Sequence, residues 1–234
     1  YWDLKGQPNK KTFISREYAY HGSTMTGMSL GGMTAMHEQG GMMPGFAHVM
    51  PPYWYKYGQE MSPEEFGIFT ANKIEEKILE LGAENIAAFI GEPIQGEGGV
   101  IIPPETYWPR VQEICSKYDI LVVVDEVICG FGRTGNWFGS DTYGINPDIA
   151  TFGKALGNGY PITALVAKEK LKNKSCDWIV ANEHYNGKES VFDSDMNSVK
   201  LVGNDNIEDW GYLTKNDVAE KLCIKISKFF NEAA

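Results

Sequence analysis

The stretch ILVVVDE, residues 120–126, decides the fold class of this chain of 234 residues. Its β-branched run shows no polar alternation, which is typical of a strand buried on both faces of a sheet. A helix with an inward-facing side that includes Trp108 is expected before it, at residues 105–118, and another apolar strand before that helix, at residues 86–90. A strand, a helix and a strand in close succession indicate a right-handed parallel unit. The sequence therefore predicts an α/β fold in which helices flank a mostly parallel sheet.

Shorter patterns on either side of this unit indicate the other elements. Further apolar runs predict strands at residues 12–14, 148–152 and 162–167. A helix is expected after Ser62, because this serine can cap a first turn in which Pro63 and Glu65 occupy favoured positions. That helix is expected to end before Gly82. The Met- and Gly-rich residues 20–58 show little sustained period, so they are interpreted as a long loop with a short helix at most.

Charge and composition exclude several classes of partner. Lysine and arginine together number 21 and aspartate and glutamate 31, so the net charge is −10, which would repel a phosphate backbone or an anionic lipid surface. We therefore expect no nucleic acid and no membrane as partners, and the longest aliphatic run, residues 120–124, is far shorter than the roughly 20 residues of a membrane-spanning helix. The cysteines lie far apart without a CxxC pair, which favours a reducing, cytoplasmic setting. They are Cys115, Cys129, Cys176 and Cys223.

The character of the chain changes near residue 168. All 11 prolines lie at or before Pro161, and the later residues are poorer in glycine and richer in asparagine. This shift predicts a large domain over residues 1–168 and an unassigned tail over residues 169–234, with an amphipathic helix candidate at residues 218–230. The first residues show neither an initiator Met nor a signal-peptide pattern, so the chain is expected to begin inside a longer protein.

Ionisable residues follow three of the expected strands. Glu92 comes just after the strand at residues 86–90, Asp125 lies at the end of ILVVVDE, and Lys154 follows the strand at residues 148–152. In open α/β sheets, ligands bind beyond the carboxyl ends of the strands. These three side chains are therefore expected to converge on one rim of the sheet.

Three chemistries compete for this rim. A magnesium-binding aspartate of an NTPase would require a GxxxxGK[ST] loop, which the sequence lacks. A dinucleotide loop would use Gly130, Gly132 and Gly135, but those glycines neither follow a strand directly nor open a helical pattern. The third chemistry uses pyridoxal phosphate, with Lys154 as a Schiff-base lysine and Asp125 beside the protonated ring nitrogen. An acid and a lysine also end strands in many proteins without such a site, so their spacing alone leaves the choice open.

Four blocks of sequence resemble the class III pyridoxal-phosphate-dependent aminotransferases, and look most like the branch that moves amino groups between ω-amino acids or amines and pyruvate. The resemblance runs from residue 1 to about residue 168, with the blocks in the family's order and spacing. It implies the large domain of a fold-type I transferase, truncated here, with pyridoxal 5'-phosphate as its cofactor. The blocks are YHGSTMTGMSLGGM at 20–33, GEPIQGEGGVIIPP at 91–104, VVVDEVICGFGRTGNWFG at 122–139 and NPDIATFGKALGNGYPITALV at 146–166.

Carried over position by position, the resemblance implies roles for seven residues. Lys154 would form the Schiff base and move a proton at the substrate Cα, while Asp125 would pair with the ring nitrogen of the cofactor. Tyr20 and Val127 would contact the two faces of the ring. The other implied pocket residues are His21, Glu92 and Ile128, the last of which stands where some relatives have glutamine. No metal is assigned.

The implied reaction is the transfer of an amino group from an amine or ω-amino acid donor to a keto acid such as pyruvate, by a homodimer. The family's phosphate-binding loop would precede the position of Tyr1, and nothing after Lys168 matches its substrate-carboxylate arginine. Two alternatives therefore stay open. One is a non-catalytic fragment of such an enzyme, and the other is an aminomutase or decarboxylase on the same scaffold.

Overall fold

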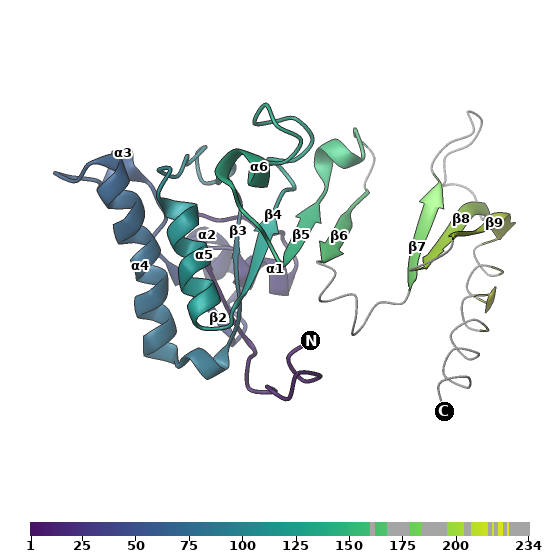
Figure 1. Ribbon diagram of the computed structural model, residues 1–234, viewed down its shortest axis with the longest axis horizontal. Coiled ribbons are helices and arrows are strands. Elements are labelled where there is room, and N and C mark those ends of the chain that lie inside the picture. The colour runs from purple at the N-terminus through teal and green to yellow at the C-terminus, as the bar shows by residue number, and fades with distance from the viewer. Residues whose placement is uncertain are drawn as a thin grey trace. The chain divides into compact units, whose positions relative to one another are not determined.

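The computed structural model describes residues 1–159, 162–167, 178–183, 196–203 and 207–214, with the single positions 217, 220, 221 and 224. They belong to two compact units, Tyr1–Glu169 and Lys170–Ala234, which are described separately (Figure 1). The helix expected at residues 218–230 lies almost entirely outside the described residues. Within the described part of the chain, no helix is long and apolar enough to cross a membrane.

One six-stranded sheet forms the centre of the first unit. Its strands are β1 Thr12–Arg16, β2 Phe46–Val49, β3 Ile86–Gly91, β4 Leu121–Asp125, β5 Ile149–Phe152 and β6 Ala164–Ala167. They lie in the order β2-β1-β3-β4-β5-β6, and all neighbours pair in parallel except β5 and β6, which are antiparallel. The predicted α/β fold with a mostly parallel sheet is confirmed, and ILVVVDE supplies β4 in its interior.

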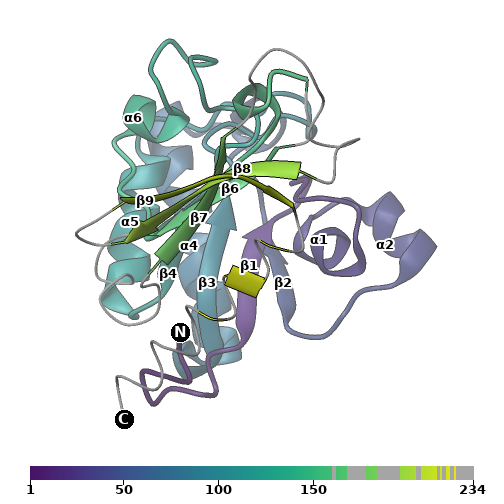
Figure 2. The same cartoon turned by 90° about the vertical axis from the view of Figure 1, so that its right-hand side faces the viewer.

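Helices cover both faces of this sheet. They are α1 Met25–Leu30, α2 Thr34–Gly40, α3 Trp54–Tyr57, α4 Pro63–Leu81, α5 Tyr107–Lys117 and α6 Gly139–Tyr143, with 3-10 turns η1 Ala83–Asn85 and η2 Lys154–Leu156. Figure 2 shows α4 and α5 on one side of the strands and α1 and α2 on the other. The α4 and α5 side holds the main core, in which Ile74, Phe89 and Trp108 are fully buried. The inward-facing Trp108 of the prediction is therefore confirmed.

The start of α4 has the capping arrangement that its sequence predicts. The Ser62 hydroxyl accepts a hydrogen bond from the Glu65 amide (3.2 Å), and the Glu65 carboxylate accepts one from the Ser62 amide (2.9 Å). Pro63 occupies the first helical position, where its missing N–H is not needed. The cap is thus complete within four consecutive residues.

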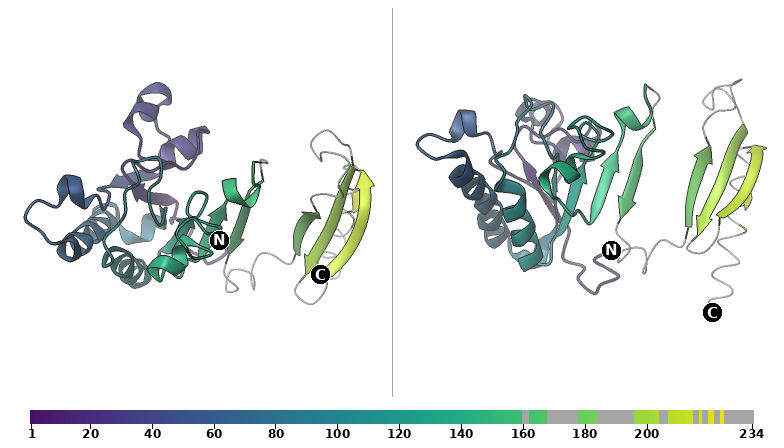
Figure 3. Two further views of the ribbon diagram at one scale, coloured as in Figure 1. Left: turned by 90° about the horizontal axis from the view of Figure 1, so that it is seen from above. Right: turned by 45° about the horizontal axis from the view of Figure 1, so that its top comes forward.

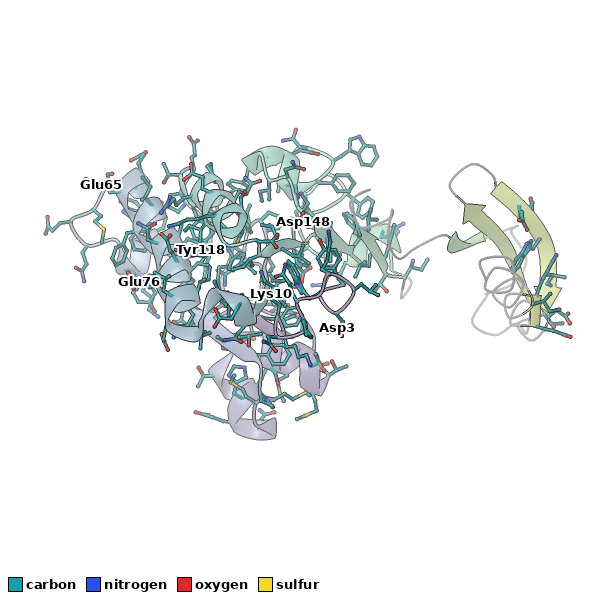
Figure 4. All side chains as sticks on the ribbon, turned by 60° about the horizontal axis from the view of Figure 1, so that its bottom comes forward. Asp3, Lys10, Glu65, Glu76, Tyr118 and Asp148 are labelled. Atoms are coloured by element: carbon teal, nitrogen blue, oxygen red, sulfur yellow. The ribbon has the colours of Figure 1, made fainter. Side chains whose placement is uncertain are left out.

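The amino end of the sheet, opposite the candidate site, is closed by the first residues of the chain. The Lys10 ammonium donates hydrogen bonds to the carbonyl oxygens of Tyr118 and Asp119, and it stands 4.2 Å from the centre of the Trp2 ring (Figure 4). Burial lowers the pKa of Lys10. The Trp2 indole donates to the carbonyl oxygen of Ala87 (2.9 Å), which ties the segment to β3.

The interpretation of residues 20–58 as a long loop with a short helix at most is wrong. This stretch contains α1, α2, α3 and the edge strand β2, which pairs in parallel with β1. The helices have six, seven and four residues and β2 has four. Elements of this length are too short to show a sustained period, so packing against neighbouring elements rather than a local pattern defines them: β2 and α1 pack against β1, α2 against α1 and α3 against α4.

The described part of the second unit contains a three-stranded antiparallel sheet. Its strands are β7 Trp178–Glu183, β8 Met196–Gly203 and β9 Ile207–Thr214, in the order β7-β8-β9 (Figure 3). All three strands pair with their neighbours in sequence. This all-antiparallel order differs from the parallel sheet of the first unit.

Candidate active site

The carboxyl ends of the parallel strands surround a cavity of about 490 Å³. Because β1, β3, β4 and β5 run in the same direction, the residues that follow them meet at one edge of the sheet. The cavity is large enough for a small-molecule ligand by the usual range for such sites. Its lining includes all seven residues that the resemblance singles out, namely Tyr20, His21, Glu92, Asp125, Val127, Ile128 and Lys154.

Asp125, the last residue of β4, is held in one orientation by two hydrogen bonds. The His21 ring donates from Nδ1 to Asp125 Oδ2 (2.7 Å), and the Val127 amide donates to Asp125 Oδ1 (3.0 Å). The exposed fractions of the His21 and Asp125 side chains are only 2% and 10%. A carboxylate fixed in this way presents a steady negative charge to anything bound in the cavity.

Lys154 opens the 3-10 turn η2 directly after β5 and Gly153. Its backbone φ is +43°, a left-handed conformation that costs a non-glycine residue about 1–3 kcal/mol. The residue is exposed and lines the cavity. It also lines a second cavity of about 710 Å³ together with Arg133 and Asn158.

Glu92 follows β3 and is only 2% exposed. Its Oε2 accepts a hydrogen bond from the Gly96 amide (2.8 Å), while Oε1 is buried without a partner among the described residues. Burial raises the pKa of Glu92, and the charges of Arg16 and His21 oppose that rise. This carboxylate therefore adds a second acidic group to the wall of the cavity.

Glu126 and the three glycines of GFGRTG do not belong to the cavity lining. The Glu126 carboxylate instead accepts hydrogen bonds from the amides of Gly139 (2.9 Å) and Ser140 (2.7 Å) at the start of α6. Gly132 and Gly135 lie in turns at positive φ, and α6 begins only at Gly139. This geometry is not that of a dinucleotide loop, which opens directly into a helix after a strand.

Arg16 is a residue of this region that the sequence patterns do not reveal. It ends β1, is fully buried, and donates from Nη2 to the carbonyl oxygen of Glu92 (2.6 Å). Its guanidinium lies 5.8 Å and 5.5 Å from the ring centres of Tyr107 and Trp108. The local pattern offers only a charged residue at the end of a short strand, TFISR, whose apolar residues are Phe13 and Ile14.

The acidic residues of the cavity wall do not form a metal site. Among the residues that the structure describes, no group of three or more His, Cys, Asp or Glu side chains is placed to hold a metal ion. The lysine and the hydrogen-bonded carboxylate instead suit an organic cofactor with a carbonyl group and a basic ring nitrogen.

Two protein families match different parts of this chain. The family described as aminotransferase class-III matches residues 1–178, and that described as DNA/pantothenate metabolism flavoprotein C-terminal domain matches residues 162–230. A putrescine–pyruvate aminotransferase of Pseudomonas aeruginosa is 58% identical over 173 residues, which cover 73% of this chain and 38% of that protein. A vanillin aminotransferase of Capsicum chinense is 46% identical over 176 residues, covering 74% and 38%.

Solved structures give the same answer for the fold. The ω-transaminase of Pseudomonas jessenii in complex with PMP superposes with a TM-score of 0.72 at 48% identity, covering 74% of this chain and 39% of that one. A thermostable (S)-enantioselective ω-transaminase of Thermomicrobium roseum gives a TM-score of 0.72 at 45% identity, covering 74% and 39%. The chain thus spans about 38% of the length of the curated relatives quoted above.

The first unit has the fold of the type I transaminases, and the aminotransferase match extends over well more than half of the chain. The members of this family depend on pyridoxal phosphate. The chain therefore belongs to the class III aminotransferases.

Proposed function

We propose that this chain carries the cofactor pocket of an enzyme that transfers an amino group from an amine or ω-amino acid to a keto acid such as pyruvate. The observation that carries the proposal is the convergence of Lys154, Asp125 and His21 on one cavity at the carboxyl ends of parallel strands. The similarity to a putrescine–pyruvate aminotransferase and to a vanillin aminotransferase supports the same class of reaction.

The residues of the cavity fit pyridoxal phosphate. Lys154 would hold the cofactor covalently through its amine, and Asp125 would keep a proton on the ring nitrogen. Tyr20 and Val127 line the same cavity and would pack on the ring faces, with Ile128 beside Val127. The bound cofactor supplies an electron sink for the bonds at the substrate Cα.

Three protein groups would then do the remaining work. Lys154 would move a proton at the substrate Cα. Its position at the start of the 3-10 turn η2, on the cavity wall, would allow its amine to reach a bound substrate. His21 would hold Asp125 in its orientation through the hydrogen bond of 2.7 Å. Glu92 would supply a second carboxyl group in the cavity wall, which interacts electrostatically with both His21 and Asp125.

The partners and the division of the chain are part of the same proposal. We propose an amine donor and a keto-acid acceptor as substrates and a homodimer as the assembly.

We further propose that residues 1–168 are part of the cofactor-binding domain and residues 169–234 a separate unit. The division of the structure after Glu169 and the antiparallel sheet of Lys170–Ala234 support this boundary, and the two family matches overlap across it at residues 162–178.

The decisive experiment is an absorption spectrum of the purified chain with added pyridoxal phosphate, followed by borohydride reduction and mass mapping. We expect a cofactor band that is lost in Lys154→Ala, with the reduced adduct on Lys154. Lys11→Ala is a matched control, because Lys11 is also exposed but lies away from the cavity lining. An absent adduct, or one scattered over surface lysines, would favour the alternative of a non-catalytic fragment.

A second assay separates the transaminase from the aminomutase or decarboxylase alternative. Consumption of an amine by the cofactor-loaded protein is measured with and without pyruvate. The proposal expects consumption beyond one equivalent per active site only when the keto acid is present, because without an acceptor each bound cofactor can take up an amino group only once. Consumption of equal size without any keto acid would contradict it.

A further inference from the structure

The second cavity, of about 710 Å³, adjoins the candidate site and differs from it in charge. It shares Val127 and Lys154 with the lining of the first cavity. The first cavity has the acidic residues Glu92 and Asp125 in its wall. In the described part of the chain, the second cavity is lined by two cations, Arg133 and Lys154, and by no acid. Such a lining, in a chain with a net charge of −10, favours an anionic ligand.

The guanidinium of Arg133 is held on one side and is open on the other. Its Nε donates a hydrogen bond to the carbonyl oxygen of Ile128 (3.2 Å), a residue that lines the first cavity. Neither Nη1 nor Nη2 forms a hydrogen bond or an ion pair with any residue that the structure describes. Two N–H groups of a guanidinium can bind both oxygens of one carboxylate, so the open side of Arg133 has the geometry for this contact.

The loop that carries Arg133 is fixed to the sheet. The Phe131 amide donates a hydrogen bond to the carbonyl oxygen of Trp137 (2.6 Å), which closes the base of the loop. The Phe131 ring packs edge-on against Phe152, the last residue of β5, with 5.8 Å between the ring centres. Lys154 follows this strand two residues later. A cation on a fixed loop loses less conformational freedom when a ligand binds than one on a mobile segment.

We propose that Arg133 binds the carboxylate of an ω-amino acid substrate whose amine lies at Lys154. The identity of the reacting group rests on the function proposed above. An ω-amino acid carries its carboxylate at the end opposite its amine. Glu92 and Asp125 would attract the amine end and repel the carboxylate, which would then lie in the second cavity. Because Lys154 would hold the cofactor, Arg133 is the remaining cation of the described lining.

The phosphate of the cofactor is the other oxyanion that a guanidinium could bind. A phosphate carries more charge than a carboxylate and is commonly held by several N–H donors, including those at helix N-termini. Among the described residues, the side chains that line the second cavity offer one guanidinium, the Lys154 amine and the Asn158 amide. One guanidinium matches the charge and shape of one carboxylate, which favours the substrate as the ligand.

The test is the binding of γ-aminobutyrate to the protein without cofactor, followed by NMR at the backbone amides of Gly153 and Ala155 in the cavity wall. The matched ligand is γ-aminobutyramide, which has an uncharged amide in place of the carboxylate. Arg133→Gln should weaken the binding of γ-aminobutyrate about tenfold, the lower end of the range for a hydrogen bond to a charged group, because Arg133 is exposed. The binding of γ-aminobutyramide should not change.

Two control variants define the contribution of Arg133. Arg133→Lys keeps the charge without the planar fork, so it should weaken binding less than Arg133→Gln. Lys11→Gln removes an exposed charge away from the cavity and should have no effect. Equal binding of γ-aminobutyrate to Arg133→Gln and to the unsubstituted chain would overturn the proposal, as would a failure of the unsubstituted chain to bind the acid more tightly than the amide.

A second titration separates the substrate carboxylate from the cofactor phosphate. Formation of the adduct on Lys154 is measured with pyridoxal phosphate and with pyridoxal, in the unsubstituted chain and in Arg133→Gln. We expect the ratio of the two affinities to be the same in both proteins. A lower preference for pyridoxal phosphate in Arg133→Gln would assign the guanidinium to the phosphate and overturn the proposal. An unsubstituted chain without any adduct would contradict the proposed function, whereas the γ-aminobutyrate titration needs no cofactor and fails separately.

Discussion

Replacing Glu126 by glutamine tests how the segment after β4 is fixed beside the cavity. Glu126 is 1% exposed, and its two carboxylate oxygens accept hydrogen bonds from the Gly139 amide (2.9 Å), the Ser140 amide (2.7 Å) and the Ser140 hydroxyl (2.6 Å). Glutamine offers one oxygen and one NH2 group, so at least one of these donors would face another donor. Glu126 immediately follows Asp125 in the sequence. Loss of its hydrogen bonds is therefore also expected to make the position of Asp125 in the cavity less fixed.

The expected cost follows from the number and kind of bonds lost. A hydrogen bond to a charged group contributes about 1.5–3 kcal/mol, and a buried donor left without a partner costs about 1–3 kcal/mol. We therefore expect Glu126→Gln to lower the free energy of unfolding by about 2–4 kcal/mol. The assay is urea unfolding followed by tryptophan fluorescence, together with hydrogen exchange at the amides of Gly139 and Ser140, whose protection should fall.

Glu76→Gln provides the matched control, because it makes the same chemical change on the surface of α4 (Figure 4). The Glu76 side chain is 62% exposed and pairs with Lys73 at 2.8 Å. An exposed pair of this kind contributes about 0.2–1 kcal/mol. The reasoning would be refuted if Glu126→Gln cost no more than Glu76→Gln, or if the exchange of the Gly139 amide did not change.

Three further predictions concern the pH response, a helix cap and a helix contact. Because burial raises the pKa of Glu92 above its usual value of 4.5, the folded state binds this proton more tightly, so stability should fall as the pH rises from 4.5 through the raised pKa. Urea unfolding across this range should show the decline, and an equal decline in Glu92→Gln would contradict it. Ser62→Ala removes the cap of α4 and should cost about 0.5–2 kcal/mol in the same assay, and an unchanged midpoint would argue against the cap. Gly67→Ala would place a Cβ against Thr106 Oγ1. The overpacking should cost about 1–3 kcal/mol, more than the gain of about 1 kcal/mol from the higher helix propensity of alanine, so the variant should be less stable. A more stable variant would show that the two helices tolerate the added methyl group.

Some residues of the candidate site could be predicted because they lie at the ends of strands that the sequence pattern indicates. Asp125 and Lys154 each follow a short apolar run, and parallel strands bring the residues after their carboxyl ends to one edge. The hydrogen bond between His21 and Asp125 spans 104 positions and could not be read from spacing. The resemblance put both residues in one pocket, and the geometry adds which atoms meet.

Other parts depend on contacts that no local pattern records. Glu126 lies next to Asp125 in the sequence and has the same chemistry, yet it points to the start of α6 instead of the cavity. Arg16 has no special neighbours in sequence, and it belongs to the site only because β1 pairs with β3 and brings its side chain to Glu92. Strand pairing and side-chain packing decide such placements.

The sequence by itself determined the elements whose causes lie within a few residues. The cap of α4 is complete in Ser62, Pro63 and Glu65, and the β-branched apolar run of β4 favours an extended strand that must be buried on both faces. Only the tertiary structure decided that β2 is a strand, that β6 runs antiparallel, and that a buried arginine lies beneath the acidic wall of the cavity. The physical reason is that a helix cap and the extended-backbone preference of β-branched residues act within a few residues, whereas an edge strand or a buried charge is stable only once its distant partners are in place.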